Sequence, residues 1–346
     1  MNRRALAICL ILAGLLAIVW WARSNEPKKS VATGSDGVGV ASTASVASAL
    51  TISSATPNAS AAPRVVDPVR VLTAKWGSGR GELGKDRPSE GNPEGPMSFA
   101  RAGKDLLVVD QVNQRLVRFD KDGKVKSTQS IGPTVQDIAV GKDGTVALLD
   151  RLGDKNVTLT DSNGKKIGTL PLGTGDPGSI TGVFVDGNTV YVEEGHGGLT
   201  GIGTTDGQPM GSPVTLGGRP TKDGALLVTG SLVAAEGKLT VNAIDRTSGT
   251  SRFARLVQMP RPSNFIVLLD SDDRGVVYAG VAAGEPEQAT IACLDPHDGH
   301  VIGRVIMPMS SDPEETFRDF SVDGDGTIVH ALRDATGVTY ATATCP

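Results

Sequence analysis

A strand–turn–strand pattern recurs along the chain from residue 69 onward, and it limits the possible folds more than any other feature. Apolar runs of strand length follow glycine-containing turns at six places: "GKDLLVVD" at 103, "KDGTVALLD" at 142, "DGNTVYVEE" at 186, "KDGALLVTG" at 222, "DDRGVVYAG" at 272 and "DGDGTIVHAL" at 323. Asp-Gly and Asn-Gly pairs supply the positive φ angles that tight hairpins require. The pattern therefore predicts a series of antiparallel hairpins.

A second set of turns follows the first five of these strands: "FDKDGK" at 119, "TDSNGKK" at 160, "TTDGQ" at 204, "DRTSGT" at 245 and "DPHDGH" at 295. Each unit then contains four short strands, with a period of about 40 to 50 residues, as in propeller blades. The 44 glycines and the aromatic content of only 4% also suit a turn-rich β protein. We predict an all-β, six-bladed β-propeller over residues 69–346.

The sixth unit, residues 317–346, provides only three strands before the chain stops. A blade without its outer strand would leave an open edge. The unassigned strand "PVRVLTAKWG" at 68–77 can complete it, so we predict that Val69–Trp76 pairs antiparallel with Val338–Cys345. The longer loops, 77–96, Glu193–Gly198 and Pro308–Glu315, are then expected on the face opposite the Asp-Gly turns.

Two segments precede the predicted propeller. Residues 1–23 contain an uninterrupted apolar run, "ALAICLILAGLLAIVWWA", which is long enough to cross a bilayer and ends in a tryptophan pair. We predict an uncleaved transmembrane signal-anchor, although a cleavable signal peptide is the alternative. Residues 24–68 are rich in Ala, Ser and Thr and are predicted to be a disordered tether. The expected location is the inner (cytoplasmic) membrane, single-pass, with the propeller in the periplasm or cell exterior.

The first unit resembles the NHL-repeat family of six-bladed propellers. The resemblance rests on Pro96, on "LLVVD" ending in Asp110, and on "VNQRLVRFD" followed by "KDGKV", after a glycine-rich segment from 77 to 96. In this interpretation Asp110, Asn113 and Arg115 form a structural polar cluster that holds the loop between two strands. An anion-binding role for Arg115 is the alternative.

Residues that could carry catalysis are scattered. The chain contains no Gly-x-Ser-x-Gly elbow, and no histidine pair has the spacing of zinc ligands. His297 and His300 lie in a tight turn, and His330 lies in the middle of a strand. Glu193, Glu194 and His196 share a glycine-rich loop that we interpret as a possible partner-binding loop. We predict no metal and no cofactor.

One set of residues leaves an enzymatic function open. Residues that begin the innermost strands of a propeller surround the mouth of its central channel, and by the repeat register these are Asp137, Thr181, Asn264 and Asp319. This ring resembles the ligand set of gluconolactonase-like propellers, which implies a divalent ion and a hydrolase or lyase activity. Those enzymes also carry a Glu at a position where this chain has Ser98 or Phe99. We therefore treat the four residues as a possible ligand-binding mouth.

Charge and cysteine content complete the prediction. The net charge of −4, without a basic stripe, argues against nucleic acid as a partner. Equivalent positions in adjacent blades usually lie too far apart for a disulfide, so Cys293 and Cys345 are predicted to be free thiols. The predicted function is a non-catalytic, membrane-anchored binding or scaffold module, with its protein partner on the loop face away from the membrane. An exported metal-dependent hydrolase or lyase is the alternative.

Overall fold

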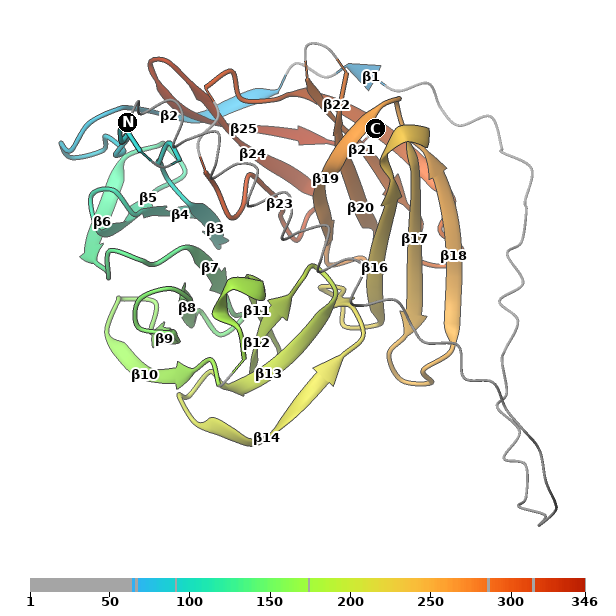
Figure 1. Cartoon of the computed structure of the whole chain (residues 1–346), viewed down its shortest axis with the longest axis horizontal. Helices are drawn as coiled ribbons and strands as arrows, with labels where there is room; N and C mark the ends of the chain where they lie inside the picture. Colours follow the sequence, from blue (N-terminus) through green and yellow to red (C-terminus); the bar gives the residue numbers. More distant parts are fainter. Residues whose placement is uncertain are drawn as a thin grey trace, which may run out of the picture. The chain divides into compact units, whose positions relative to one another are not determined.

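The computed structural model describes residues 64–65, 68–90, 92–173, 175–284, 287–312 and 315–345. Six sheets surround a central axis (Figure 1). Each contains four antiparallel strands, and one of the six also carries a fifth, parallel strand at its edge. The described part of the chain is therefore a six-bladed β-propeller, as predicted. No helix in this part is long and apolar enough to cross a membrane. The predicted anchor and nearly all of the predicted tether lie outside the described residues.

Each of the first five blades is a run of four consecutive strands. Blades 1 to 3 consist of β3 (Ser98–Ala102), β4 (Asp105–Asp110), β5 (Arg115–Phe119), β6 (Val125–Ser130), β7 (Asp137–Val140), β8 (Val146–Asp150), β9 (Asn156–Thr160), β10 (Lys166–Pro171), β11 (Ile180–Asp186), β12 (Thr189–Glu194), β13 (Gly198–Thr204) and β14 (Pro209–Leu216). Blades 4 to 6 contain β15 (Arg219–Pro220), β16 (Leu226–Val233), β17 (Lys238–Asp245), β18 (Ser251–Gln258), β19 (Ser263–Ser271), β20 (Val277–Ala283), β21 (Gln288–Leu294), β22 (Val301–Pro308), β23 (Phe320–Val322), β24 (Thr327–Asp334) and β25 (Gly337–Thr344). Two short 3-10 helices, η1 (Pro177–Ser179) and η2 (Ala234–Glu236), interrupt the connections.

The two faces of the ring differ in their connections. The tight glycine turns join the first strand to the second and the third to the fourth, and their glycines have positive φ, as at Gly123 (75°) and Gly144 (85°). We call this side the turn face. The remaining connections, including residues 76–90, 92–97, 195–197, 309–312 and 315–319, lie on the opposite side, which we call the loop face.

An N-terminal strand closes the ring, as predicted. Strand β2 (Val69–Lys75) pairs antiparallel with β25, with Val69 opposite Thr342 and Lys75 opposite Gly337. Trp76 lies just beyond the ladder and instead forms an isolated bridge with Leu83. The sixth blade thereby gains the outer strand that the C-terminal segment could not supply.

A further strand was not predicted. Strand β1 (Arg64–Val65) pairs in parallel with β22, opposite Val305 and Ile306, and adds a fifth strand to blade 5. The chain thus contacts two neighbouring blades before its first complete repeat. A strand at this position covers backbone groups that an edge strand would otherwise expose.

Buried hydrophobic clusters hold neighbouring blades together. Within the described residues, five such clusters fill the interfaces between blades 1 and 2, 2 and 3, 4 and 5, 5 and 6, and 6 and 1. In the last of these, the rings of Phe99 and Tyr340 meet edge to face, with centroids 5.3 Å apart. No cluster among the described residues fills the interface between blades 3 and 4. Ion pairs join those two blades instead, Glu193 with Arg219 and Asp186 with Arg246.

The prediction of free thiols at Cys293 and Cys345 is wrong. The two residues form a disulfide between blades 5 and 6, with Cα atoms 6.5 Å apart. The prediction assumed that the residues occupy equivalent heights in their blades. Cys345 in fact follows the end of β25, where the chain leaves the ladder and packs against the buried cluster that contains Cys293.

The polar cluster of blade 1 is structural, which confirms the interpretation of the LLVVD segment. Asp110 is fully buried, and its carboxylate accepts hydrogen bonds from the Arg115 Nε (2.7 Å), the Asn113 Nδ2 (2.9 Å) and the backbone N of Gly84 (2.8 Å). The Arg115 guanidinium also donates to the carbonyl oxygens of residues 78, 79 and 82. The cluster therefore fastens the glycine-rich segment before β3 to the first blade.

Candidate functional site: the central cavity and the loop face

A cavity of about 830 Å³ lies at the centre of the ring and reaches the turn face. Its walls come mainly from the innermost strands and the turns that follow them. The wall from blades 1 to 3 is largely apolar and includes Ala139, Phe184 and Val185, whereas blades 5 and 6 contribute mostly polar groups such as Asp270 and Asp323. A volume of this size is typical of sites for small organic ligands.

A long segment closes the channel on the loop face. Its described residues, 309–312 and 315–319, lie between β22 and β23, and the backbone N of Phe317 donates to the carbonyl of Met97 (2.7 Å). The Phe317 side chain packs against the buried clusters of blades 1 to 3, and the Arg151 guanidinium lies 4.7 Å from its ring centroid. Arg318 follows and lines the cavity from this side.

Arg318 is held at the centre of the ring by Asp137, the first residue of β7. Asp137 is almost fully buried; its carboxylate receives the Arg318 Nη2 (2.9 Å) and Nε (3.2 Å), the Ser98 hydroxyl (2.6 Å) and the backbone N of Val183 (2.9 Å). Burial opposes the charged form of Arg318, but Asp137 and the more distant carboxylates of Asp270 and Glu193 raise its pKa. Arg318 is therefore a permanent cation.

The four residues predicted at the channel mouth have four separate partners. Asp137 binds Arg318, the Thr181 hydroxyl donates to the Glu193 carboxylate (3.0 Å), the Asp319 carboxylate binds Arg333 (2.5 Å), and the exposed Asn264 donates to Glu287. None of the four lines the central cavity. Each begins or adjoins an innermost strand as predicted, but their side chains bind these separate partners and do not converge on a common point.

Glu193 and Arg219 form a buried ion pair between blades 3 and 4. The Arg219 Nε and Nη2 donate to the two carboxylate oxygens of Glu193 at 2.6 and 2.8 Å, and Arg219 Nη1 donates to the carbonyl of Leu269 (2.8 Å). Burial alone would raise the pKa of Glu193, but the hydrogen bonds from Arg219, His196 and Thr181 and the charge of Arg219 lower it to about 2. Glu193 is therefore ionised and inaccessible to a partner.

The predicted partner-binding loop is a tight turn. Residues 195–197 join β12 to β13, and the backbone N of Gly195 donates to the carbonyl of Ser179 (2.9 Å). Glu194 is exposed, and the His196 side chain is 73% exposed with its Nδ1 3.5 Å from the Glu193 carboxylate. Two of the three predicted residues thus lie on the surface of the loop face.

Two longer loops on the loop face are bonded to each other. Lys85 and Arg87 both form ion pairs with Asp312, the backbone N of Glu315 donates to the carbonyl of Pro93 (2.9 Å), and the Asn92 amide donates to the Glu315 carboxylate (3.0 Å). We refer to residues 85–90, 92–94, 309–312 and 315–317 as the loop-face platform. Long loops in other proteins are often mobile, but these support each other across the start and end of the ring.

Charged groups surround the opening of the cavity on the turn face. Arg101 pairs with Asp323 (3.0 Å) and Lys222 pairs with Asp270, in each case between blades. The Lys142 ammonium donates to the carbonyl of Lys222 (2.9 Å) and so reaches from blade 2 to blade 4. Burial raises the pKa of Asp323, with Arg101 partly opposing that shift. The opening is therefore polar, and its ion pairs join blade 1 to blade 6 and blade 4 to blade 5.

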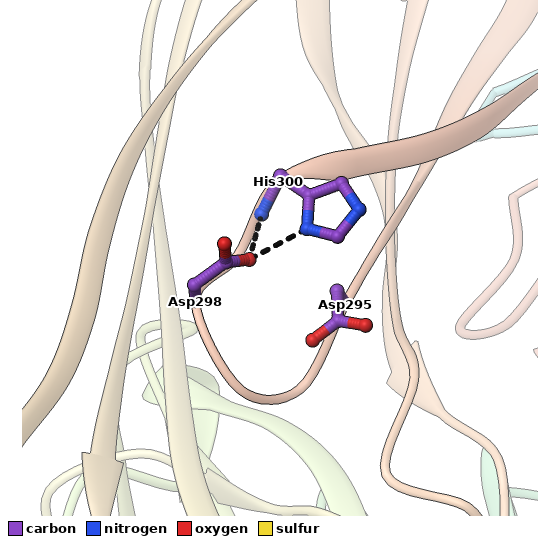
Figure 2. Close-up of side chains that lie close together, drawn as sticks. All are labelled: Asp295, Asp298 and His300. Atoms are coloured by element: carbon purple, nitrogen blue, oxygen red, sulfur yellow. Dashed lines mark hydrogen bonds and ion pairs between the residues drawn. The ribbon is translucent and has the colours of Figure 1, made fainter. Parts of the chain in front are cut away.

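Asp295, Asp298 and His300 lie close together in the turn between β21 and β22 (Figure 2), with potential ligand atoms within 4.8 Å of one another. One Asp298 oxygen accepts both the backbone N (2.9 Å) and the Nδ1 (2.7 Å) of His300, and Asp295 accepts the backbone N of His297 (2.8 Å). These local hydrogen bonds from side chains to the backbone stabilise the tight turn. This agrees with the interpretation of both histidines as turn residues.

Sequence reasoning missed Arg219 and Arg318, the two arginines that organise the centre of the ring. One signal was present, because Arg318 lies in "FRDF", between two aromatic residues in a chain with few of them. Nothing in the repeat register marks Arg219, which belongs to a strand of only two residues.

Comparisons with known proteins add little beyond the fold. No protein-family model and no curated protein sequence matches the chain. Among solved structures, the hydrazine synthase of Kuenenia stuttgartiensis is 16% identical with a TM-score of 0.47, over 72% of this chain and 79% of that chain. BamB from Moraxella catarrhalis is 17% identical with a TM-score of 0.38, over 71% of each chain. The propeller assignment rests on the strand pairing described above.

Proposed function

We propose that this chain is a non-catalytic, membrane-anchored propeller that binds or scaffolds a protein partner outside the cytoplasm. The loop-face platform is the observation that carries the proposal. It offers exposed residues of both charges, including Asp86, Arg87 and Glu90, on a backbone held by contacts between its two loops. A rigid irregular surface of this kind suits protein recognition, because little ordering entropy is lost on binding.

The anchor, the tether and the relationship to NHL-repeat propellers belong to the same proposal. Residues 1–23 have the length and flanking residues of a membrane anchor, and residues 24–68 have the composition of a tether. The clamp around Asp110 supports an NHL-like first blade, since it uses the residues that carry that resemblance. In this arrangement β2 begins near the turn face, so the loop-face platform points away from the membrane.

The alternative, a metal-dependent hydrolase or lyase, receives less support from the geometry. The carboxylate of Asp137 is already neutralised by Arg318, and a cation bound there would have to displace a buried guanidinium. Asn264 and Asp319 have other partners. We therefore favour binding over catalysis.

Crosslinking in native membranes tests the proposal. The experiment compares the full-length chain with a Glu90→Lys variant on the loop-face platform and an Asp122→Lys variant on the turn face. Both substituted side chains are exposed. We expect Glu90→Lys to reduce the yield of the crosslinked partner at least about fivefold through charge reversal, and Asp122→Lys to leave it unchanged. Equal crosslinking by the two variants would contradict a loop-face partner, and recovery of the chain in the soluble fraction would contradict the anchor.

A further inference from the structure

The central cavity has a charge arrangement that the proposed protein-binding function does not use. Arg318 lines the cavity, and its side chain is 21% exposed. Its Nε and Nη2 bind Asp137, and Nη2 also contacts the carbonyl of Val183 (3.4 Å). The third nitrogen, Nη1, has no hydrogen-bond partner among the described residues. One donor of this partly buried cation is thus left free at the inner end of a solvent-connected cavity.

Further cations lie along the same side of the cavity. Lys104 of blade 1 makes no ion pair within the described structure, and Lys142 of blade 2 donates only to a backbone carbonyl. The acids without an ion pair, Asp273 and Asp325, belong to blades 5 and 6 on the other side. A molecule lying against blades 1 to 3 would therefore meet the free Nη1 donor of Arg318 at the inner end of the cavity, and Lys104 and Lys142, which make no ion pair in the described structure, at its opening.

The wall between these cations is apolar. Ala139, Val140, Phe184 and Val185 line it, and each is partly exposed to the cavity. The Phe184 ring also lies beneath the guanidinium of Arg318, 5.4 Å from its carbon to the ring centroid. Contact with this wall would remove apolar surface of a ligand from water, which is the main source of affinity for small organic molecules.

We infer that the central cavity binds a small amphipathic organic anion, with an apolar ring or chain against blades 1 to 3 and a carboxylate on Arg318 Nη1. Charge-assisted hydrogen bonds of this type are roughly twice as strong as neutral ones, so the carboxylate would dominate specificity. Entry is from the turn face, because Phe317 and Arg318 close the other side. The site is separate from the loop-face platform, so either proposal can fail without the other.

Naphthoate is a suitable probe, and naphthamide is its neutral counterpart. Binding of each to the purified full-length chain is measured by calorimetry. We expect one naphthoate per chain, with naphthamide at least about tenfold weaker. Absence of naphthoate binding, or equal binding of the two compounds, would overturn the inference.

Two variants locate the site. Arg318→Lys keeps a positive charge beside Asp137 but removes the planar guanidinium, which can bind Asp137 and the ligand carboxylate at the same time. Naphthoate affinity should therefore fall about tenfold. Ala139→Phe leaves Arg318 in place and fills the apolar wall, so it should abolish binding. Arg252→Lys, which alters an ion pair with Asp245 outside the cavity, is the matched control and should bind normally. Unchanged binding by Ala139→Phe would overturn the site even if Arg318→Lys failed to fold.

Discussion

Replacing His330 should remove much of the protein's sensitivity to mild acid. His330 lies in β24 with no exposed surface, and its ring stacks on Phe320 with centroids 3.8 Å apart. Neither ring nitrogen has a hydrogen-bond partner among the residues that the structure describes. Burial, and to a smaller degree the charge of Arg333, lower its pKa from 6.5 to about 3, with Asp319 partly opposing the shift. The folded protein therefore holds this imidazole neutral, and His330→Phe or His330→Leu removes the group that protonates.

The expected magnitude follows from the two pKa values. As the pH falls below 6.5, the unfolded chain takes up a proton at this position and the folded chain does not, so stability is complete above that pH and declines toward about 3. Each pKa unit corresponds to about 1.4 kcal/mol, which gives at most about 5 kcal/mol in total. Between about pH 7 and pH 5 the loss is about 2 kcal/mol, a range in which most carboxylates remain ionised in both states.

Urea unfolding followed by circular dichroism, at about pH 7 and about pH 5, measures this loss in the parent and in both variants. The comparison is between the two pH values within each protein, so a packing change at pH 7 does not affect it. We expect the parent to lose about 2 kcal/mol more than either variant. Equal losses would refute a neutral, buried His330.

Three further predictions concern the ties between elements. Glu193→Gln should destabilise the ring by about 2 kcal/mol, because it leaves the partly buried Arg219 without a counterion. Thermal unfolding measures this loss, and a value below about 1 kcal/mol would contradict the role of this pair. Arg115→Ala should release the segment before β3, seen as faster proteolysis between residues 77 and 84, and unchanged cleavage would argue against the clamp. Thiol labelling of the denatured, non-reduced chain should find neither Cys293 nor Cys345 free, and reduction should cost about 4 kcal/mol for a separation of 52 residues.

Local sequence was sufficient to predict the blades. Asp-Gly and Asn-Gly turns specify hairpins through backbone geometry, and their spacing sets the number of strands in each unit. The sixth unit lacked an outer strand, and the segment that begins at Val69 was the one predicted strand not assigned to a blade. The sequence therefore predicted that this segment pairs with the C-terminal strand. The short strand β1 had no such signal, since two residues of a polar segment carry no periodicity.

The candidate site was predicted less well, because its geometry depends on one irregular segment. The register correctly placed Asp137 at the start of an innermost strand, yet it could not show that Arg318 enters the channel and binds it. Glu193 was expected on the surface, but Arg219 of the next blade draws it into a buried pair. The partners in these two ion pairs are 26 and 181 positions apart, so a local sequence pattern could not predict their contacts.

By itself the sequence determined the fold class, the number of blades, the way the ring closes and the polar clamp of the first blade, all of which depend on short-range turn geometry and repeat spacing. Only the tertiary structure decided that Cys293 and Cys345 meet, that ion pairs join blades 3 and 4, and that the central cavity is closed on the loop face and reached from the turn face. The physical reason is that burial, pairing of charges and cavity shape are set by side chains that distant segments bring together.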